Sequence, residues 1–105
     1  MINIVLLCAG GISTSILAKN IEEAALELGF DCKVNAYGVP KARDVVPKAD
    51  IVLVGPQVRF AIDKLKKEFP SKDISVIDMR DYGRMNGINV ILTIKERLSL
   101  IESDI

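Results

Sequence analysis

Four short apolar segments alternate with longer amphipathic segments along the 105 residues of the chain. This order is typical of βαβ units, in which a helix crosses over between two parallel strands. The apolar segments predict strands at Asn3–Leu7, Asp31–Ala36, Ile51–Val54 and Ile74–Ile77. We therefore expect one α/β domain, residues 1–105, built on a four-stranded parallel sheet.

The connections between these strands predict their order in the sheet. Right-handed crossovers with helices on both faces give a small doubly wound sheet with the order 2-1-3-4. The second segment is the least apolar of the four, which suits an edge strand. Ligands of such sheets bind where the strand order reverses, so we expect the site beyond the carboxyl ends of the first and third strands.

Three amphipathic segments predict the longer helices. Gly29 stands where a C-terminal cap belongs, Pro56 and Pro70 bound the third helix, and a short second helix is predicted at Lys41–Val46. Apolar side chains that recur at helical spacing are assigned to the core; they are Leu17, Ile21, Ala24 and Leu28, then Val58, Ile62, Leu65 and Phe69, then Ile91, Ile94, Leu98, Ile101 and Ile105.

The first predicted strand runs directly into a loop that contains Cys8, with a helix predicted to begin near Ile16. Glycines allow consecutive backbone N–H groups to converge on one point, and the amino end of the following helix favours a bound anion and a thiolate. Cys8 alone would be read as a small buried side chain that ends a strand, but the loop favours a nucleophile that carries a phosphoryl group. The predicted phosphate-binding residues are Ala9, Gly10, Gly11, Ile12, Ser13, Thr14 and Ser15.

The second cysteine, Cys32, opens a strand, whereas Cys8 ends a neighbouring one. A strand of about five residues at about 3.3 Å each separates them by more than a disulfide can bridge. We therefore assign Cys32 a structural role.

The composition excludes several classes of protein. Fourteen Lys and Arg balance fourteen Asp and Glu, which argues against nucleic acid or an anionic membrane as the main ligand. The chain has no histidine and no Cys-x-x-Cys pair, so we expect neither a metal site nor a cofactor. No basic residue precedes the apolar N-terminus, and Gly10 and Gly11 interrupt it, so we expect a cytoplasmic protein with reduced cysteines.

Two further loops are predicted to meet the cysteine loop at the same edge of the sheet. One is Gly55-Pro56-Gln57 and the other is Asp78–Asn86. The Gln57 amide is either a contact to phosphate or partner, supported by Pro56, or an exposed side chain at a helix start. Tyr82 is either a contact to phosphate or a half-buried ring packed under the loop.

Charged residues follow the third and fourth predicted strands. Arg59, Arg80 and Arg84 are expected at the same edge, either as solvated side chains or as docking contacts for a partner protein. Asp78 is expected either to have a plain turn role or to orient the loop by accepting N–H bonds.

Taken together, three segments resemble the enzyme IIB component of the lactose/cellobiose family of bacterial sugar phosphotransferase systems. They are the cysteine loop, the Val-Gly-Pro-Gln segment that ends at Gln57, and the Ile-Asp…Tyr-Gly-Arg-Met-Asn-Gly stretch that ends at Gly87. The resemblance implies that Cys8 receives phosphate from a phosphohistidine of the IIA protein. It also implies that Cys8 passes the phosphate to a disaccharide such as cellobiose, chitobiose or lactose, bound by the membrane IIC protein. Tyr82 resembles a tyrosine that the family keeps near the site.

Three other classes of protein each need a feature that differs from this sequence. A low-molecular-weight phosphatase needs an arginine six residues after its cysteine to grip phosphate, and Thr14 stands there. A thiol redox protein needs a resolving cysteine close to Cys8. A nucleotide-binding module needs a glycine motif, Gly-x-x-x-x-Gly-Lys-Ser/Thr or Gly-x-Gly-x-x-Gly, that the chain lacks.

Overall fold

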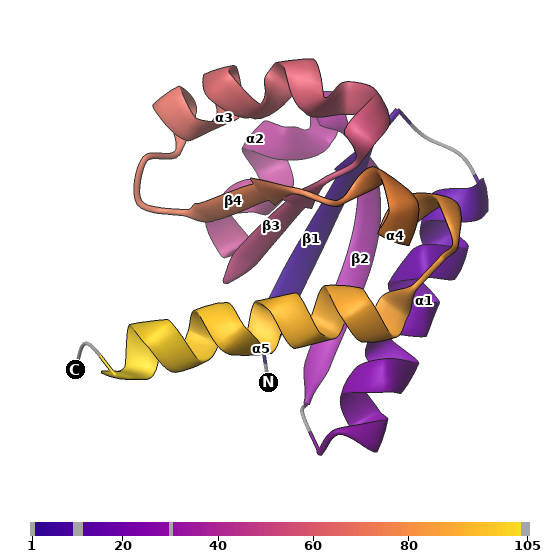
Figure 1. Cartoon of the computed structure of the whole chain (residues 1–105). Helices are drawn as coiled ribbons and strands as arrows, with labels where there is room; N and C mark the ends of the chain where they lie inside the picture. The colour runs from indigo at the N-terminus through magenta and orange to yellow at the C-terminus, as the bar shows by residue number, and fades with distance from the viewer. Residues whose placement is uncertain (1, 10–11, 30, 104–105) are drawn as a thin grey trace.

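The structure is a computed structural model that describes residues 2–9, 12–29 and 31–103, without the side chains of 12–14 and 97–103. Four parallel strands form one sheet in the order β2-β1-β3-β4 (Figure 1). They are β1 Ile2–Cys8, β2 Cys32–Gly38, β3 Ile51–Val54 and β4 Asp73–Val76. The predicted doubly wound sheet is therefore confirmed, with β2 at an edge.

The register brings the carboxyl ends of the strands to one edge of the sheet. Cys8 lies opposite Gly38, and Leu7 lies opposite Val54 of β3. Cys32 is paired with Ile2 at the other end of β1, as predicted, and neither cysteine forms a disulfide.

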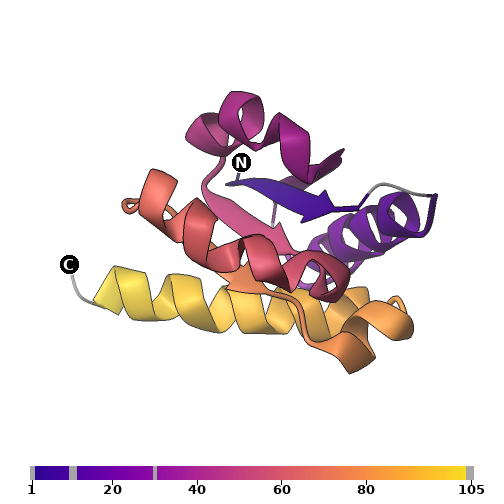
Figure 2. The same ribbon diagram turned by 90° about the horizontal axis from the view of Figure 1, so that it is seen from above.

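Helices cover both faces of the sheet (Figure 2). On one face lie α1, Ile12–Glu27, and α5, Gly87–Ser103. On the other lie α2, Ala42–Val45, and α3, Ile62–Glu68, with 3₁₀ turns at Val39–Lys41, Val46–Lys48 and Pro56–Ala61. The short α4, Met79–Gly83, follows β4 at the carboxyl edge.

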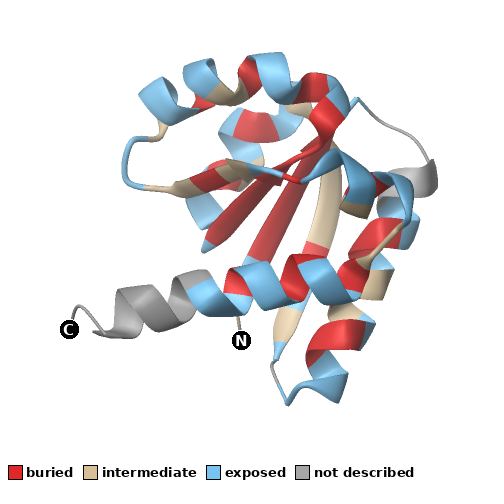
Figure 3. Ribbon diagram, in the orientation of Figure 1, coloured by how far each residue is buried: buried red, intermediate tan, exposed pale blue. Residues whose placement is uncertain are grey.

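The alternation of side chains along the central strands divides the core into two layers. In β1, Ile4 and Leu6 join the layer under α1 and α5, while Val5 and Leu7 join the layer under α2 and α3. Both central strands are buried on both faces (Figure 3), which explains why they read as continuous apolar runs.

Several predicted boundaries were wrong. Helix α1 begins at Ile12, one turn before the predicted start at Ile16. Leu28 is exposed, because α1 ends at Glu27 and Gly29 turns the chain with a φ of 73°. The fourth strand begins one residue earlier than predicted, although Ile77 remains buried.

Two predicted segments have a different local structure. The third helix opens as a 3₁₀ turn with a kink at Val58 (φ −119°, ψ 24°), because Pro56 begins it in the tighter geometry. The segment predicted as an open loop at Asp78–Asn86 contains α4. Of the stripe predicted in the last helix, Ile91 and Ile94 are buried; the side chains of Leu98 and Ile101, and Ile105 itself, lie outside the described residues.

Candidate functional site

The Cys8 side chain lies at the carboxyl end of β1, at the edge predicted for the site. The residue is 4% exposed, and its Sγ donates a hydrogen bond to the Tyr37 carbonyl of β2 at 3.5 Å. The thiol is therefore shielded from bulk water on the side of the sheet.

The predicted phosphate-binding residues divide between a connection and a helix. Ala9 is exposed beside Cys8, whereas Gly10 and Gly11 lie outside the described residues. The backbone of 12–15 is not loop as predicted: it forms the first turn of α1, and the Ser15 side chain there is exposed. The first N–H groups of a helix have no partner within it, and they carry the positive end of its dipole. The correction therefore places the amino end of a helix four residues after the cysteine.

The second predicted loop meets the end of β1 at Gly55. The Gly55 N–H donates to the Leu7 carbonyl at 2.8 Å, so this glycine lies beside the residue that precedes Cys8. A β-carbon on Gly55 would lie 3.4 Å from Gln57 Oε1 and 3.5 Å from the Tyr82 ring. The structure thus gathers Gln57 and Tyr82 at one point of the carboxyl edge.

For both residues the structure shows exposure and packing, whereas contact with phosphate stays a prediction. Gln57 is exposed at the start of a 3₁₀ turn behind the buried Pro56, yet its amide oxygen turns back toward the strand ends. Tyr82 is more deeply buried than a half-buried ring, and it packs beneath Gly55 and Gln57.

Asp78 caps α4. Its Oδ1 accepts hydrogen bonds from the backbone N–H groups of Arg80, at 2.8 Å, and Asp81, at 3.4 Å. Asp78 therefore accepts N–H groups, as the loop-orienting interpretation expects, and these bonds fix the start of the helix that presents Tyr82.

The carboxyl edge also exposes two large apolar side chains that sequence reasoning missed. Phe60 in the 3₁₀ turn after β3 is 80% exposed, and Met79 in α4 is 64% exposed. Both stand beside the predicted arginines, Arg59, Arg80 and Arg84, all of which are exposed. Phe60 could have been noticed because it lies off the stripe of apolar residues that includes Val58 and Leu65.

The opposite end of the sheet holds Cys32 in different surroundings. Burial raises the pKa of the Cys32 thiol above its ordinary value, and the carboxylates of Glu22 and Asp31 raise it further. Because the thiolate is the nucleophilic form, Cys32 is a poor nucleophile at neutral pH.

The described residues lack two features: a cluster of metal-ligating side chains and a helix that could cross a membrane. No three His, Cys, Asp or Glu side chains of the described part come together as a metal site would require. Among the helices that the structure describes, none combines the length and the apolar character needed to cross a bilayer.

Comparison with known families shows to which protein family the chain belongs. The family model of the lactose/cellobiose-specific IIB subunits of the phosphotransferase system (PTS) matches residues 3–93. The chain belongs to this family. It is a IIB component of a sugar phosphotransferase system, and so takes part in sugar transport as a transferase component.

Individual relatives agree with this assignment. The oligo-β-mannoside-specific EIIB component of Bacillus subtilis is 40% identical over 89 residues, which cover 83% of this chain and 86% of the relative. The lactose-specific IIB domain from Streptococcus pneumoniae superposes with a TM-score of 0.81 over 90% of this chain and 95% of that one; at 20% identity, this likeness concerns the fold.

Another relative is a larger protein that carries a similar segment. The lactose-specific EIICB component of Lactococcus lactis is 33% identical over 75 residues, covering 71% of this chain and 13% of the relative. Relatives of this IIB chain thus include proteins named for IIC and IIB together.

Proposed function

We propose that Cys8 is a phosphorylated cysteine that receives its phosphoryl group from a phosphohistidine of a cytoplasmic IIA protein. It passes the group to a disaccharide bound by the membrane IIC protein. The observation that carries this proposal is the position of Cys8 at the end of β1, four residues before Ile12 begins the first turn of α1. The cysteine sulfur and the amino end of a helix, which favours anions, thereby share one edge of the sheet.

The chemistry divides into two displacements at phosphorus. In the first, the Cys8 thiolate attacks, the P–N bond of the donor breaks, and the imidazole leaves with the electron pair. In the second, a sugar hydroxyl attacks, its proton is released, the S–P bond breaks, and the thiolate is restored. Residues 9–15 would bind the phosphoryl oxygens and stabilise their charge in both transition states.

The residues around the loop also favour transfer over hydrolysis. A carrier must hold its phosphoryl group until the acceptor arrives, so activation of water is a disadvantage. The chain has no histidine to act as a general base, and Thr14 stands where related phosphatase loops carry an arginine.

The exposed residues at the carboxyl edge suit contact with partner proteins. Phe60 and Met79 offer apolar area, and Arg59, Arg80 and Arg84 offer positive charge toward a phosphorylated donor. Pro56, Gln57 and Tyr82 support the loop between these contacts and Cys8. Sugar selection is assigned to IIC, because relatives named for oligo-β-mannoside and for lactose share this domain.

Intact-mass spectrometry tests the proposal. The chain is incubated with phosphoenolpyruvate, the general phosphotransferase proteins and a cognate IIA protein, and the expected result is a gain of one phosphoryl group that peptide mapping places on Cys8. Phosphate on any other residue would overturn the assignment. Turnover of an aryl phosphate at enzymatic rates by the unmodified chain, lost in Cys8→Ser, would show a phosphatase instead.

A further inference from the structure

The amino end of α5 packs against α1 more closely than any side chain would allow. A β-carbon on Gly87 would lie 2.4 Å from the backbone carbon of Asn20, 2.5 Å from its oxygen and 2.7 Å from the Ile21 nitrogen. Separations under about 3 Å are not found for real β-carbons, and the obstacle is helix backbone, so it cannot move aside as a side chain would. Position 87 therefore requires glycine for the two helices to keep this distance.

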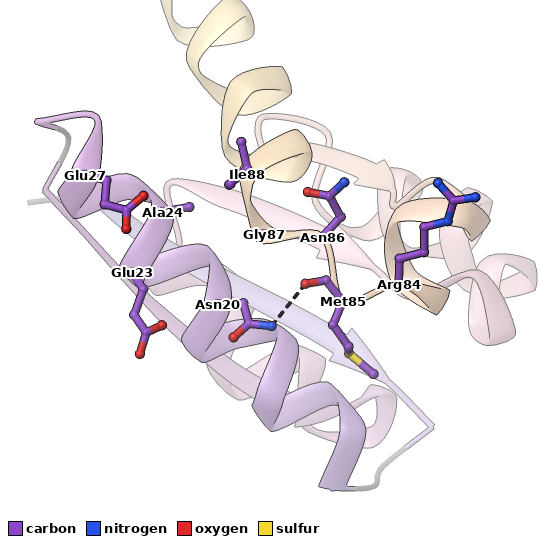
Figure 4. A pocket seen from close by; sticks show the side chains of 9 residues that line it. All are labelled: Asn20, Glu23, Ala24, Glu27, Arg84, Met85, Asn86, Gly87 and Ile88. Carbon is purple, nitrogen blue, oxygen red and sulfur yellow. Dashed lines mark hydrogen bonds between the residues drawn. The ribbon is translucent and has the colours of Figure 1, made fainter.

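A side-chain hydrogen bond closes the same contact (Figure 4). Asn20 Nδ2 of α1 donates to the Met85 carbonyl at 3.0 Å. Met85 is held in the left-handed region with a φ of 53°, a conformation that is unfavourable for a residue with a side chain. The Gly87 N–H donates to the same carbonyl at 3.0 Å, so one oxygen joins α1 to the start of α5.

The segment on the far side of this contact is internally fixed. The Asn86 N–H donates to the Asp81 carbonyl at 2.8 Å, and Asn86 Oδ1 caps α5 by accepting from the Asn89 N–H at 3.0 Å. Asn89 Nδ2 donates to Asp81 Oδ1 at 3.1 Å. We call residues 78–89 the bracket, because they join the two helices α4 and α5 into one unit.

The bracket touches the candidate site at its other end. Tyr82 of the bracket packs against Gly55, beside the strand end that carries Cys8. One side of the bracket therefore rests on Gly55, which follows β3 and is hydrogen-bonded to Leu7 of β1, and the other side rests on α1 at Asn20. A phosphoryl group on Cys8 would sit between the end of β1 and the first turn of α1.

We propose that Asn20 and Gly87 are positioning residues that set the distance between the first turn of α1 and Cys8. The inference rests on the proposed function of Cys8. Asn20 lies eight residues after Ile12, about 12 Å along a rigid helix, so a displacement of α1 at Asn20 also moves its amino end. Neither residue touches the phosphoryl group, and each acts through the placement of α1.

Three variants and three controls test this role in the full chain. Gly87→Ala pushes the helices apart, Asn20→Ala removes the hydrogen bond, and Asn20→Asp removes the donor while keeping the shape. Gly83→Ala is the matched glycine control, because a β-carbon there meets nothing within 4 Å. Lys19→Ala controls for a change on α1, and Val46→Ala removes buried volume from the other core layer and so controls for lost stability.

The measurement is the rate of phosphoryl transfer from phospho-IIA to Cys8, separated into kcat and KM. Misplacement by about 1 Å costs about 100-fold in rate, so we expect kcat to fall about 100-fold in Gly87→Ala and about 10-fold in both Asn20 variants. KM for phospho-IIA should stay within about twofold, because the exposed docking residues are unchanged. The three controls should keep a kcat near that of the unchanged chain.

Two results would overturn the inference while leaving the proposed function in place. One is a kcat in both Asn20 variants that equals the kcat of the unchanged chain. These two variants also suffice as the test if Gly87→Ala does not fold. The other is a loss of kcat in Val46→Ala as large as in the Asn20 and Gly87 variants, at the same decrease in melting temperature. That result would show that lower stability alone reduces kcat. Failure of the unchanged chain to become phosphorylated on Cys8 would instead reject the proposed function itself.

Discussion

The two cysteines of this chain lie at opposite ends of neighbouring strands, and their surroundings differ accordingly. Cys8 ends β1 at the edge where helix amino ends, Gly55 and the bracket meet. Cys32 begins β2 at the edge where the carboxylates of Glu22 and Asp31 raise the pKa of its thiol. The proposed function gives a nucleophilic role to the cysteine at the carboxyl edge, whereas the raised pKa of Cys32 disfavours such a role at the other edge. In a parallel sheet this difference follows from strand direction, because the carboxyl ends face helix amino ends.

Replacing each cysteine in turn is the most direct test of the difference between the two edges. Cys8→Ser should abolish phosphoryl acceptance, since a serine hydroxyl is far less acidic than a thiol and the chain has no histidine to act as its base. Cys32→Ser should accept a phosphoryl group at the unchanged rate. Both are measured by intact mass after incubation with the phosphoryl donor proteins. Retained acceptance in Cys8→Ser, or its loss in a folded Cys32→Ser chain, would reverse the assignment of the two edges.

Exposed apolar residues also differ between the two edges, because those at the carboxyl edge are proposed to bind the partner protein. Phe60→Ser at the carboxyl edge should raise KM for phospho-IIA about 10-fold, because exposed aromatic side chains contribute strongly to protein contacts. Leu26→Ser is the matched control, since Leu26 is 69% exposed on α1 but belongs to the opposite end of that helix. Steady-state transfer kinetics would decide: equal KM values in the two variants would remove Phe60 from the docking surface.

The sheet was predictable from sequence because its strands are uninterrupted apolar runs with clear borders. Ile51–Val54 was predicted with the bounds that the structure shows, since Asp50 and Gly55 delimit it. The helical stripe was extended wrongly to Leu28, because apolar spacing continues past the point where the chain turns at Gly29. Periodicity identifies an element more reliably than it identifies its ends.

The parts of the site that were missed depend on contacts between distant residues. Helix α4 is too short for a periodic pattern, and it owes its form to the Asp78 cap and to the burial of Tyr82. The need for glycine at position 87 arises from the backbone of Asn20, which is 67 positions away in the sequence. A single sequence carries no signal for such a pair. The cysteine loop, in contrast, is contiguous, so its pattern of residues can be recognised directly in the sequence.

The smallest expected effect concerns the electrostatics of the Cys32 edge. Glu22→Gln removes a charge that raises the pKa of the Cys32 thiol, while the amide oxygen can still accept the Val34 N–H, which Glu22 Oε1 accepts at 2.6 Å. The pKa should move down toward its ordinary value but stay raised, because burial is the larger cause.

At a fixed pH below that pKa, a larger thiolate fraction should then speed alkylation by iodoacetamide severalfold at most. The assay uses the Cys8→Ser background, in which Cys32 is the one thiol of the chain. The raised pKa also implies that Cys32 stabilises the fold below the unfolded-state pKa of its thiol and loses this contribution as pH rises through the folded value. Glu22→Gln should therefore reduce the fall of melting temperature on the alkaline side. The exposed neighbour variant Glu23→Gln should change neither measurement, and an equal acceleration there would remove Glu22 as a specific cause.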